Sequence, residues 1–352
     1  MIRNGAPGTW RPGRAQAGSA DMAGAGPVPE DPPDRAAGTM EFIGVSTSDS
    51  FIKRLFPLWA GELGLAGARL VGRDLPLHAE PGHYREMVER LRDDPLTAGA
   101  LVTTHKVDLL AATRGLFGEL DPWAQLCNEV SCISKRDGRL RGHAKDPITA
   151  GRTLEALLGP GYFGRTGAEG LCFGAGGAGL AITVYLLSRP EQADRPLRLI
   201  VTETRPERLT ELRSVHHRLG GPPPGTTVEY LPVNGPGAGT ELLAGLTDGS
   251  LVVNATGMGK DRPGSPLGDD ARFPEGAVVW ELNYRGPLDF LAQARRQAAD
   301  RGLLVEDGWR YFLHGWSEHI AEVFRLDLTP ERFERLRQVA ETLRSPTGPT
   351  GG

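Results

Sequence analysis

A short apolar segment with three spaced glycines restricts the possible folds of this 352-residue chain more than any other feature. The segment LCFGAGGAGLAI places Gly174, Gly176 and Gly179 in the spacing G-x-G-x-x-G, directly between an apolar strand and an apolar helix. In such a loop the first glycine permits a tight turn, the second lets a pyrophosphate approach the backbone, and the third lets the helix pack against the strand. A plain glycine-rich turn is the alternative. The strand–loop–helix context favours dinucleotide binding by a glycine loop made of Gly174, Ala175, Gly176, Gly177, Ala178 and Gly179.

An acidic residue at the end of the next strand bears on the choice of cofactor. The apolar strand expected at residues 197–204 carries Glu203, 24 residues after Gly179. An acidic side chain at this place can bind the ribose hydroxyls of NAD, and it would repel a 2′-phosphate. Arg205 and Arg208 follow closely and could hold that phosphate, although both also fit a solvated helix start. We therefore predict NAD as the cofactor and leave NADP open.

Alternating strands and helices on both sides of the glycine loop predict an α/β protein. Before the loop we expect strands at 40–45, 68–76 and 98–103, helices at 51–64 (interrupted by Pro57), 83–94 and from Val107, and a hairpin at 130–140 with an Asp137-Gly138 turn. From residue 147 onward we expect strands at 197–204, 227–233, 251–256 and 277–284, and helices at 147–158, from the loop to about Leu187, from Pro206, at 308–325 and at 329–344. The second series has the rhythm of a Rossmann-type, doubly wound parallel sheet.

Length and composition exclude several classes of protein. The chain is about twice as long as a typical domain of ~150 residues, so two domains are expected. Residues 1–39 hold 7 Gly and 6 Pro among few aliphatic residues, which predicts disorder, and Met22 and Met40 are alternative starts. A net charge of −4 argues against a nucleic-acid partner, and the lack of a long uncharged apolar run argues against a membrane span.

Cysteine and histidine spacing gives no sign of a metal site. The three cysteines, Cys127, Cys132 and Cys172, form no C-x-x-C pair, which argues against structural zinc and against a disulfide framework and fits a cytoplasmic location. His314 and His319 lie five residues apart on an expected helix without a further ligand pattern. We therefore expect no metal.

Several separated motifs resemble those of one enzyme family. They are VTTHK (102–106), DGRLRGHAKD (137–146), GAGGAG (174–179), VVNATGMG (252–259), ELNYRGP (281–287), Gly302 and Asp307-Gly308. In their order along the chain they are similar to the motifs of the shikimate/quinate dehydrogenases, from residue 41 to about 325. The resemblance implies reversible hydride transfer between a nicotinamide and an alcohol carbon of a six-membered ring.

The resemblance also implies an arrangement of domains. We expect a disordered tail (1–39), an α/β substrate-binding and catalytic domain (40–146), a Rossmann NAD(P)-binding domain (147–306), C-terminal helices returning to the substrate domain (307–345) and a loose end (346–352). The active-site cleft would then lie between the two domains. A monomer or a homodimer is expected.

Two residues carry the chemistry that the resemblance implies. Lys106 matches the family's catalytic lysine and could stabilise a developing alkoxide and deliver a proton, provided that burial or a neighbouring cation lowers its pKa from roughly 10.4. Asp146 matches the catalytic aspartate. It also has a simpler explanation, because an Asp before Pro147 at a helix start is a typical N-cap.

Further positions are implied to line the cleft. On the cofactor side they are Glu203, Arg205, Asn254, Thr256, Met258 and Gly308; on the substrate side they are Ser48, Ser50, Thr103, Ser131, Lys145 and Tyr284. Asn254, Thr256 and Met258 fit a strand-end turn equally well, and Tyr284 fits a core aromatic.

The substrate shell departs from the family pattern. Ser131 stands at the family's asparagine, Ala144-Lys145 at its Asn-Thr, and Gly315 or Trp316 at its glutamine. We therefore expect shikimate itself to be a poor substrate, while another cyclic polyol in carbocycle metabolism (quinate-, aminoshikimate- or cyclitol-like) is the expected one. Lys145, with Lys53 and Arg54 near the first loop, suggests an anionic substrate, unless these are solvated surface charges. A catalytically silent nicotinamide-binding regulator and another Rossmann carbonyl or imine reductase are the alternatives.

Overall fold

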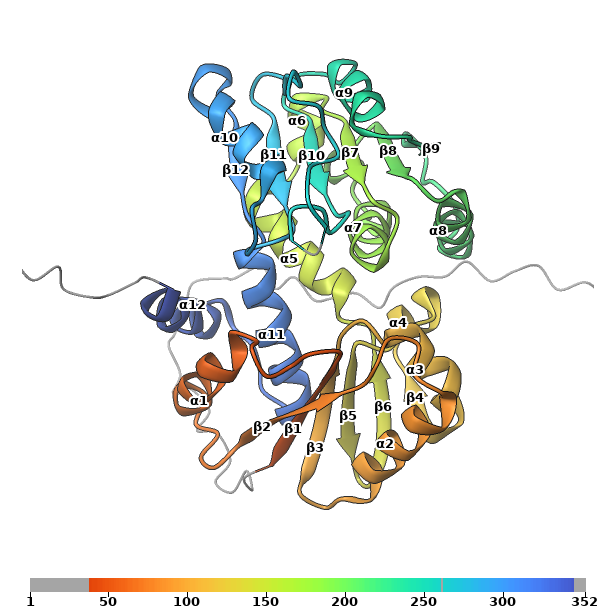
Figure 1. Ribbon diagram of the computed structural model, residues 1–352, viewed down its shortest axis with the longest axis vertical. Coiled ribbons are helices and arrows are strands. Elements are labelled where there is room, and N and C mark those ends of the chain that lie inside the picture. The colour runs from red at the N-terminus through yellow and green to blue at the C-terminus, as the bar shows by residue number, and fades with distance from the viewer. Residues whose placement is uncertain (1–37, 261, 345–352) are drawn as a thin grey trace, which may run out of the picture.

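The computed structural model describes residues 38–260 and 262–344, which form two lobes stacked end to end (Figure 1). Each lobe is built around a six-stranded sheet. The expected disorder at 1–39 and the loose end at 346–352 lie outside the described residues, apart from Gly38 and Thr39. Within the described ranges, no helix is both long enough and apolar enough to cross a membrane.

The first lobe holds a mixed sheet. Its strands run in the order β2 (Arg69–Asp74), β1 (Thr39–Gly44), β3 (Thr97–Val102), β5 (Cys132–Arg136), β6 (Arg139–His143) and β4 (Phe117–Leu120). β1 pairs in parallel with both β2 and β3, whereas β5 is antiparallel to β3 and to β6. The hairpin between β5 and β6 turns at Asp137 and Gly138, whose φ angles are 51° and 75°. Two positive φ values are typical of a type I′ turn, so the hairpin expected from the sequence is confirmed.

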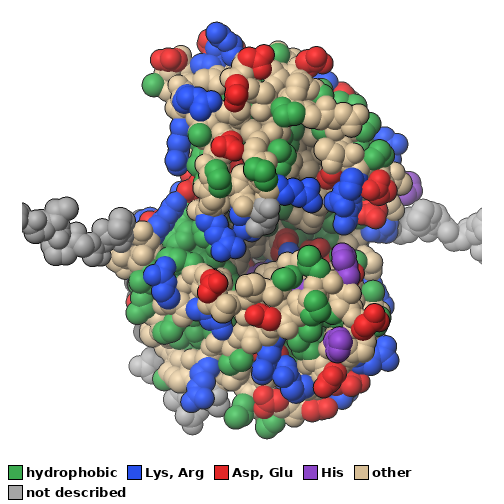
Figure 2. All heavy atoms as spheres, viewed as in Figure 1, with side chains coloured by type: hydrophobic (Ala, Val, Ile, Leu, Met, Phe, Trp, Pro, Cys, Tyr) green, Lys and Arg blue, Asp and Glu red, His purple; other side chains and the backbone are tan. Residues whose placement is uncertain are grey.

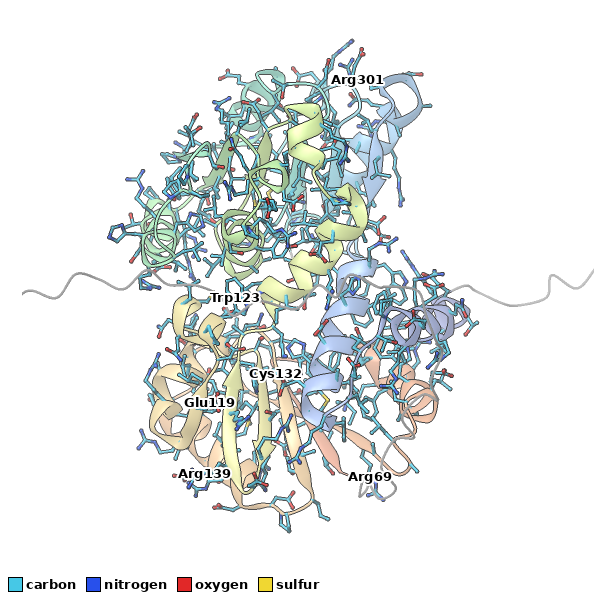
Figure 3. The ribbon with its side chains drawn as sticks, turned by 180° about the vertical axis from the view of Figure 1, so that it is seen from behind. Arg69, Glu119, Trp123, Cys132, Arg139 and Arg301 are labelled. Carbon is cyan, nitrogen blue, oxygen red and sulfur yellow. The ribbon has the colours of Figure 1, made fainter. Side chains whose placement is uncertain are left out.

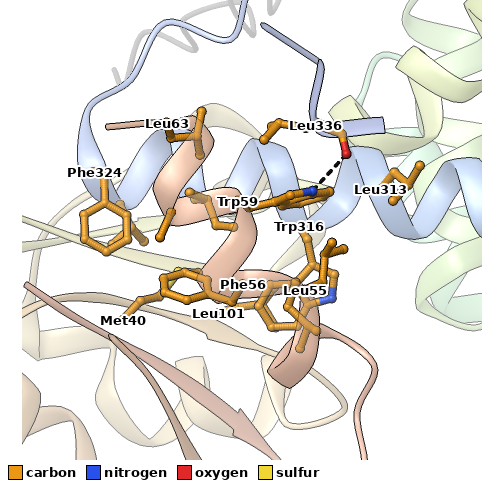
Figure 4. Packing of buried hydrophobic residues seen from close by; sticks show 14 of the residues in the cluster. Met40, Leu55, Phe56, Trp59, Leu63, Leu101, Leu313, Trp316, Phe324 and Leu336 are labelled. Carbon is orange, nitrogen blue, oxygen red and sulfur yellow. Dashed lines mark hydrogen bonds between the residues drawn. The ribbon is translucent and has the colours of Figure 1, made fainter. Parts of the chain in front are cut away.

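Helices cover both faces of this sheet. Neighbouring residues of each strand point to opposite faces, so a strand with consecutive apolar residues needs helices on both sides. On one face Met40 and Phe42 pack against α1 (Ile52–Glu62), α11 (Trp309–Phe324) and α12 (Pro330–Arg344). On the other face Ile43 packs in a cluster with α2 (Pro81–Asp93), α3 (Lys106–Thr113) and α4 (Pro122–Cys127). Trp59 Nε1 donates to the carbonyl of Leu336 at 2.9 Å and so fastens α1 to α12 (Figure 4).

The second lobe holds a wholly parallel sheet. Its strands run in the order β12 (Leu304–Glu306), β11 (Val278–Glu281), β10 (Leu251–Asn254), β7 (Gly170–Phe173), β8 (Arg198–Glu203) and β9 (Thr227–Pro232). Counted from β7, this is the order 3-2-1-4-5-6 of a doubly wound nucleotide-binding fold. The order confirms the predicted Rossmann-type architecture.

Two separate clusters show that helices also cover both faces of the second sheet. Cys172 of β7 packs with α5 (Asp146–Leu158) and α7 (Gly177–Ser188), whereas Phe173 packs with α9 (Pro236–Ala244) and α10 (Asp289–Arg301). The remaining helices are α6 (Tyr162–Thr166), α8 (Pro206–Arg218) and two 3₁₀ turns at Arg114–Leu116 and Gln192–Asp194. α5 and α11 pass between the lobes (Figure 1).

Two local predictions are wrong. α1 runs unbroken through Pro57, because burial of Leu55, Phe56 and Trp59 outweighs the one backbone hydrogen bond that a proline removes. Asp146 is the first residue inside α5 rather than its N-cap; Lys145 occupies the cap position without a capping side chain. The carboxylate of Asp146 therefore stands in the first turn of α5 and does not cap it.

Candidate active site

Lys106 opens α3 at the point where the central strand β3 ends. The turn before it places Thr104 at a φ of 48°, and His105 is 1% exposed with its Nδ1 2.9 Å from the hydroxyl of Tyr84. Because this buried contact fixes the turn, the side chain of Lys106 leaves the sheet in a defined direction, toward the second lobe.

Lys106 and Asp146 form a short charge-assisted hydrogen bond, in which Nζ donates to Oδ2. Burial alone lowers the pKa of Lys106, but the carboxylates of Asp146 and Glu129 outweigh it, so that the net pKa is raised. Burial raises the pKa of Asp146, and the Lys106 cation brings it below its ordinary value. The condition set from the sequence, a lowered pKa of Lys106, is therefore not met in the protein alone; Lys106 is a cation held by an anion.

A third ionisable group, Glu129, lies beside this pair and was not predicted from the sequence. It is 4% exposed, and burial raises its pKa to about 7, against the opposing effect of Lys106. The only local signal is that Glu129 is the single acidic residue in the four-residue connection between α4 and β5.

A cleft between the lobes brings these groups to the glycine loop. Its volume is about 750 Å³, and its lining includes Lys106, Glu129, Gly176, Gly177 and Arg205. Figure 2 shows the hollow between the lobes, with charged side chains at its floor. The cleft joins the candidate acid–base residues to the candidate cofactor loop.

The glycine loop has the shape that a dinucleotide requires. Gly174 has a φ of 103°, and a Cβ on Gly179 would stand 1.9 Å from the carbonyl oxygen of Gly174, so neither position accepts a side chain. A Cβ on Gly176 would meet nothing within 4 Å, which leaves open space in front of the N-terminus of α7. Backbone N–H groups at a helix N-terminus are a ready site for the diphosphate of a dinucleotide.

Glu203 lies at this loop as expected. Its Oε2 accepts from the backbone N–H of Ala175 at 3.2 Å. Burial alone would raise the pKa of Glu203. The hydrogen bonds from the backbone N–H groups of Ala175, Thr204 and Arg205 lower it by more, so the net pKa is below its ordinary value and the group is a carboxylate. A cavity of about 220 Å³ beside it is lined by Glu203, Arg205, Thr256 and Met258, among others. Arg208 instead pairs with Glu211 at 3.2 Å.

Asn254 and Gly308 lie at the carboxyl-end edge of the second sheet, where Asn254 ends β10 and Gly308 follows β12. The Asn254 side chain is fully buried; its Nδ2 donates to Glu281 at 2.6 Å, and its Oδ1 accepts from the Thr256 hydroxyl at 2.6 Å. A Cβ on Gly308 would stand 2.0 Å from the carbonyl of Leu282, so only glycine lets α11 begin against the end of β11. Asn254 thus holds the turn that carries Thr256 and Met258, whereas Gly308 packs against the residues that follow β11.

The expected substrate-side residues are only partly gathered at the cleft. Ser131 is fully buried behind Asp146, and its hydroxyl accepts from the backbone N–H of Lys145 at 2.8 Å. Thr103 Oγ1 donates weakly to the carbonyl of Ile43 at 3.5 Å. Ser48 is exposed and Ser50 half-buried, on a loop that Thr47 fastens to Asp74.

An aromatic cluster surrounds Tyr284. Its ring lies 4.8 Å from Phe312 and 5.9 Å from Trp309, and Phe51 packs on Trp309 at 5.1 Å between ring centroids. An apolar wall therefore stands next to the loop in which the sequence suggests paired serines. Tyr284 is a packing residue of this wall.

The three cations taken as signs of an anionic substrate have partners within the protein. Lys145 is 9% exposed and its Nζ lies 2.8 Å from Oε2 of Glu322; this cation brings the pKa of Glu322 to about 2 although burial alone would raise it. Lys53 donates to the carbonyl of Leu70 at 3.4 Å, and Arg54 lies over the ring of Phe51 at 5.0 Å. Lys145 is thus neither a surface charge nor free for substrate, and that argument for an anionic substrate is lost.

The two helical histidines are packed inside the first lobe. His314 stacks on Phe333 at 4.0 Å between ring centroids, and the nitrogens of His319 lie 2.6 Å from the carbonyl of Gly315 and 3.1 Å from that of Ser131. Among the residues the structure describes, no group of three or more His, Cys, Asp or Glu side chains could hold a metal ion.

Known proteins of similar sequence carry one enzyme name. No protein-family model matches the chain. A shikimate dehydrogenase (NADP+) from Methylobacterium radiotolerans is 31% identical over 263 residues, which cover 69% of this chain and 81% of that protein. A protein of the same name from Methylocella silvestris is 29% identical over 286 residues, covering 80% and 88%.

Solved structures share the fold. Shikimate 5-dehydrogenase from Thermus thermophilus, in complex with NADP(H) and shikimate, has a TM-score of 0.62 at 24% identity and covers 86% of this chain and 99% of that one. Quinate dehydrogenase from Corynebacterium glutamicum with NAD gives 0.64 at 21%, covering 87% and 99%. The 5-ketofructose reductase of a Gluconobacter strain gives 0.63 at 16%, covering 88% and 100%. At these identities the likeness concerns the fold.

Proposed function

The chain belongs to the shikimate/quinate dehydrogenase family, and on this premise we propose that it is an NAD(P)-dependent oxidoreductase that interconverts an alcohol and a ketone on the ring of a cyclic polyol. The observation that carries the proposal is the Lys106–Asp146 pair, whose lysine lines the same cleft as the glycine loop. A pure nicotinamide-binding regulator would need the loop but not the pair.

The residues of this chain divide the chemistry as follows. A bound nicotinamide supplies or accepts the hydride. Lys106 stabilises the oxygen that gains negative charge when hydride reaches a carbonyl, and donates the proton to it. Asp146 holds the amine of Lys106 in position and keeps it protonated, since its carboxylate raises the pKa of the amine. In the direction of alcohol oxidation, Lys106 must first be deprotonated, so that direction is favoured at alkaline pH.

We propose NAD as the preferred cofactor. Support comes from Glu203, whose carboxylate is held at the glycine loop by the N–H of Ala175 at 3.2 Å. An anion fixed there accepts ribose hydroxyls and repels a 2′-phosphate. The curated relatives are named for NADP+, so NADP is the alternative, and Arg205 beside Glu203 is the residue that would serve it.

The preferred substrate is a ring alcohol other than shikimate. Ser131 is buried behind Asp146 rather than exposed to the cleft, and the place of the family's glutamine falls on Gly315, which has no side chain, or on Trp316, which is buried in the core. Hydrogen-bond partners for ring hydroxyls are therefore fewer than the family pattern implies. The aromatic wall around Tyr284 offers an apolar surface in their place.

A spectrophotometric screen tests the function. NAD and NADP reduction is followed with shikimate, quinate and their amino-substituted and decarboxylated ring analogues, and a Lys106→Ala variant is run in parallel. We expect turnover with at least one ring alcohol and its loss in the variant. NADH binding without turnover of any ring alcohol or ketone would favour the regulator, and turnover that survives Lys106→Ala would remove the proposed mechanism.

A further inference from the structure

Glu129 is a buried acid whose charge is not compensated by a direct contact. Glu41, which is 2% exposed, is paired with Arg73 at 2.9 Å, and the fully buried Glu281 accepts from Asn254 and Asn283 at 2.6 and 2.7 Å. Glu129, 4% exposed, makes no hydrogen bond or ion pair with any residue that the structure describes. Burying a charged group without a partner is costly, so a role for this carboxyl is to be sought in the cleft that it lines.

The carboxyl points toward the glycine loop. Its Oε2 lies 3.9 Å from the place where a Cβ on Gly177 would stand, at the first residue of α7. Gly177 is also where the helix N-terminus offers its N–H groups to a diphosphate. An ionised Glu129 and a bound diphosphate would then be like charges in one partly desolvated site.

Charged and titratable groups face Glu129 from each element around it. They are Lys106 on α3, Asp146 on α5, Tyr311 on α11 and Cys127 on α4, with Arg205, Arg208, Glu211, Arg218, His78 and Asp108 along the cleft. Lys106 already has Asp146 as its partner, and Arg208 has Glu211. Among the described residues, Lys106 is the one cation that lowers the pKa of Glu129, and it is shared with Asp146.

We propose that Glu129 binds the nicotinamide dinucleotide in its protonated form, so that cofactor binding takes up a proton at this residue. The neutral carboxyl can donate a hydrogen bond to an oxygen of the anionic diphosphate. The ionised carboxylate has no proton to donate and repels the diphosphate. This inference rests on the proposed function and adds a positioning residue to it.

Protonation of Glu129 and binding of the dinucleotide should favour each other. Burial holds the pKa of Glu129 at about 7 in the free protein, and a bound dianion raises it further. The apparent affinity is therefore highest below that pKa and falls as pH rises through it. Between about pH 6 and about pH 8, the dissociation constant of NADH should weaken about tenfold.

The test combines binding and proton counting on the full chain. NADH and NADPH are titrated by fluorescence at several pH values, and calorimetry near pH 7.5 in two buffers of different ionisation enthalpy gives the number of protons taken up. We expect a net uptake of roughly half to one proton per cofactor in the wild type. Glu129→Gln, which is neutral at every pH, should bind with nearly constant affinity and take up no proton. A matched control is Glu119→Gln, which removes an exposed acid on the outer edge strand β4 (Figure 3) and should keep the wild-type pH dependence.

The outcomes separate this inference from the function beneath it. Binding that is independent of pH, or a pH dependence that survives in Glu129→Gln, overturns the role of Glu129 and leaves the oxidoreductase intact. Failure of NADH and NADPH to bind at any pH overturns both. If Glu129→Gln does not fold, proton uptake by the wild type still decides, because an uptake near zero contradicts the proposal.

Discussion

Lys145 and Glu322 are joined by an ion pair of 2.8 Å, which ties the residue before α5 to α11. These are the two helices that pass between the lobes (Figure 1). Lys145 has this carboxylate as its hydrogen-bonded partner, whereas Glu322 also contacts Arg136 at 3.0 Å and His143 at 3.3 Å. Glu322 is therefore the central residue of a cluster that it forms with Lys145, Arg136 and His143.

Removing the two partners should have unequal effects on stability. Glu322→Leu leaves Lys145 and Arg136 without their anion and should lower the free energy of unfolding by about 3 kcal/mol. Lys145→Met should cost less, about 1 kcal/mol, because Glu322 keeps Arg136. Urea unfolding of both variants and of the double variant measures this order. Equal losses would contradict the central role of Glu322.

The same cluster makes stability sensitive to acid. Lys145 and the other cations bring the pKa of Glu322 to about 2, although burial raises it. A carboxyl with a depressed pKa contributes stability above its unfolded pKa of ~4.3 and loses that contribution as pH falls toward the folded value. Between about pH 4.5 and about pH 2 the wild type should lose more stability than the Lys145→Met/Glu322→Leu double variant. Parallel pH profiles for the two proteins would show that the ion pair has no part in acid unfolding.

Lys106→Ala should abolish turnover without harming the fold. Loss of an acid–base group costs roughly two to four orders of magnitude in kcat. Because Lys106 donates to Asp146 rather than to the glycine loop, the dissociation constant of NADH at about pH 6 should change little. Steady-state kinetics with the best ring alcohol, and circular dichroism as a control for folding, check this. Activity near that of the wild type would contradict the assignment.

Substitution of two glycines in the same loop should affect cofactor binding in one case and folding in the other. Gly176→Ala places its methyl in open space where the diphosphate is expected, at an ordinary φ of −76°, so it should weaken NADH binding at least ~tenfold and leave thermal stability unchanged. Gly179→Ala forces a methyl to 1.9 Å from the Gly174 carbonyl and should destabilise the second lobe. NADH titration and thermal melts of both variants give the comparison. Intact binding in Gly176→Ala would refute the loop as the cofactor site.

Shikimate should be a poor substrate. Each missing hydrogen bond to a ring hydroxyl costs roughly 0.5–1.5 kcal/mol, and two polar positions of the family pattern are changed here, one at Ser131 and one at Gly315 or Trp316. The value of kcat/KM for shikimate should therefore lie about 10² below that for the preferred ring alcohol. Shikimate turnover above about 10⁴ M⁻¹s⁻¹ would show that other side chains have replaced the missing ones.

Sequence patterns predicted what depends on local chemistry. The glycine loop and the Asp137-Gly138 turn could be located because their backbone conformations demand particular residues. The sequence also gave a reason to bring Lys106 and Asp146 together, although 40 residues separate them, because each stands in a recognisable motif.

What depended on distant contacts could not be predicted. Whether Lys145 faces the cleft or Glu322 is decided by the docking of α11, 177 residues further along the chain. The approach of Glu129 to the second lobe is likewise a distant contact, since its Oε2 lies 3.9 Å from the place of a Cβ on Gly177. Pro57 shows the same limit in a helix, since tertiary burial overrides a local helix breaker.

The crossing of α5 and α11 has a mechanical consequence. The helices α5 and α11 connect the two lobes and restrict how the lobes can move relative to each other. Atoms close to these connecting helices travel least when the lobes move apart. Asp146 is the first residue of α5 and so belongs to one of the two connecting helices, and Lys106 of the first lobe is hydrogen-bonded to it. The glycine loop belongs to the second lobe and lies across the cleft from Lys106. Swinging of the lobes would thus vary the gap that a hydride must cross while the proton donor stays in place, so that reactants could come and go without disassembly of the acid–base pair.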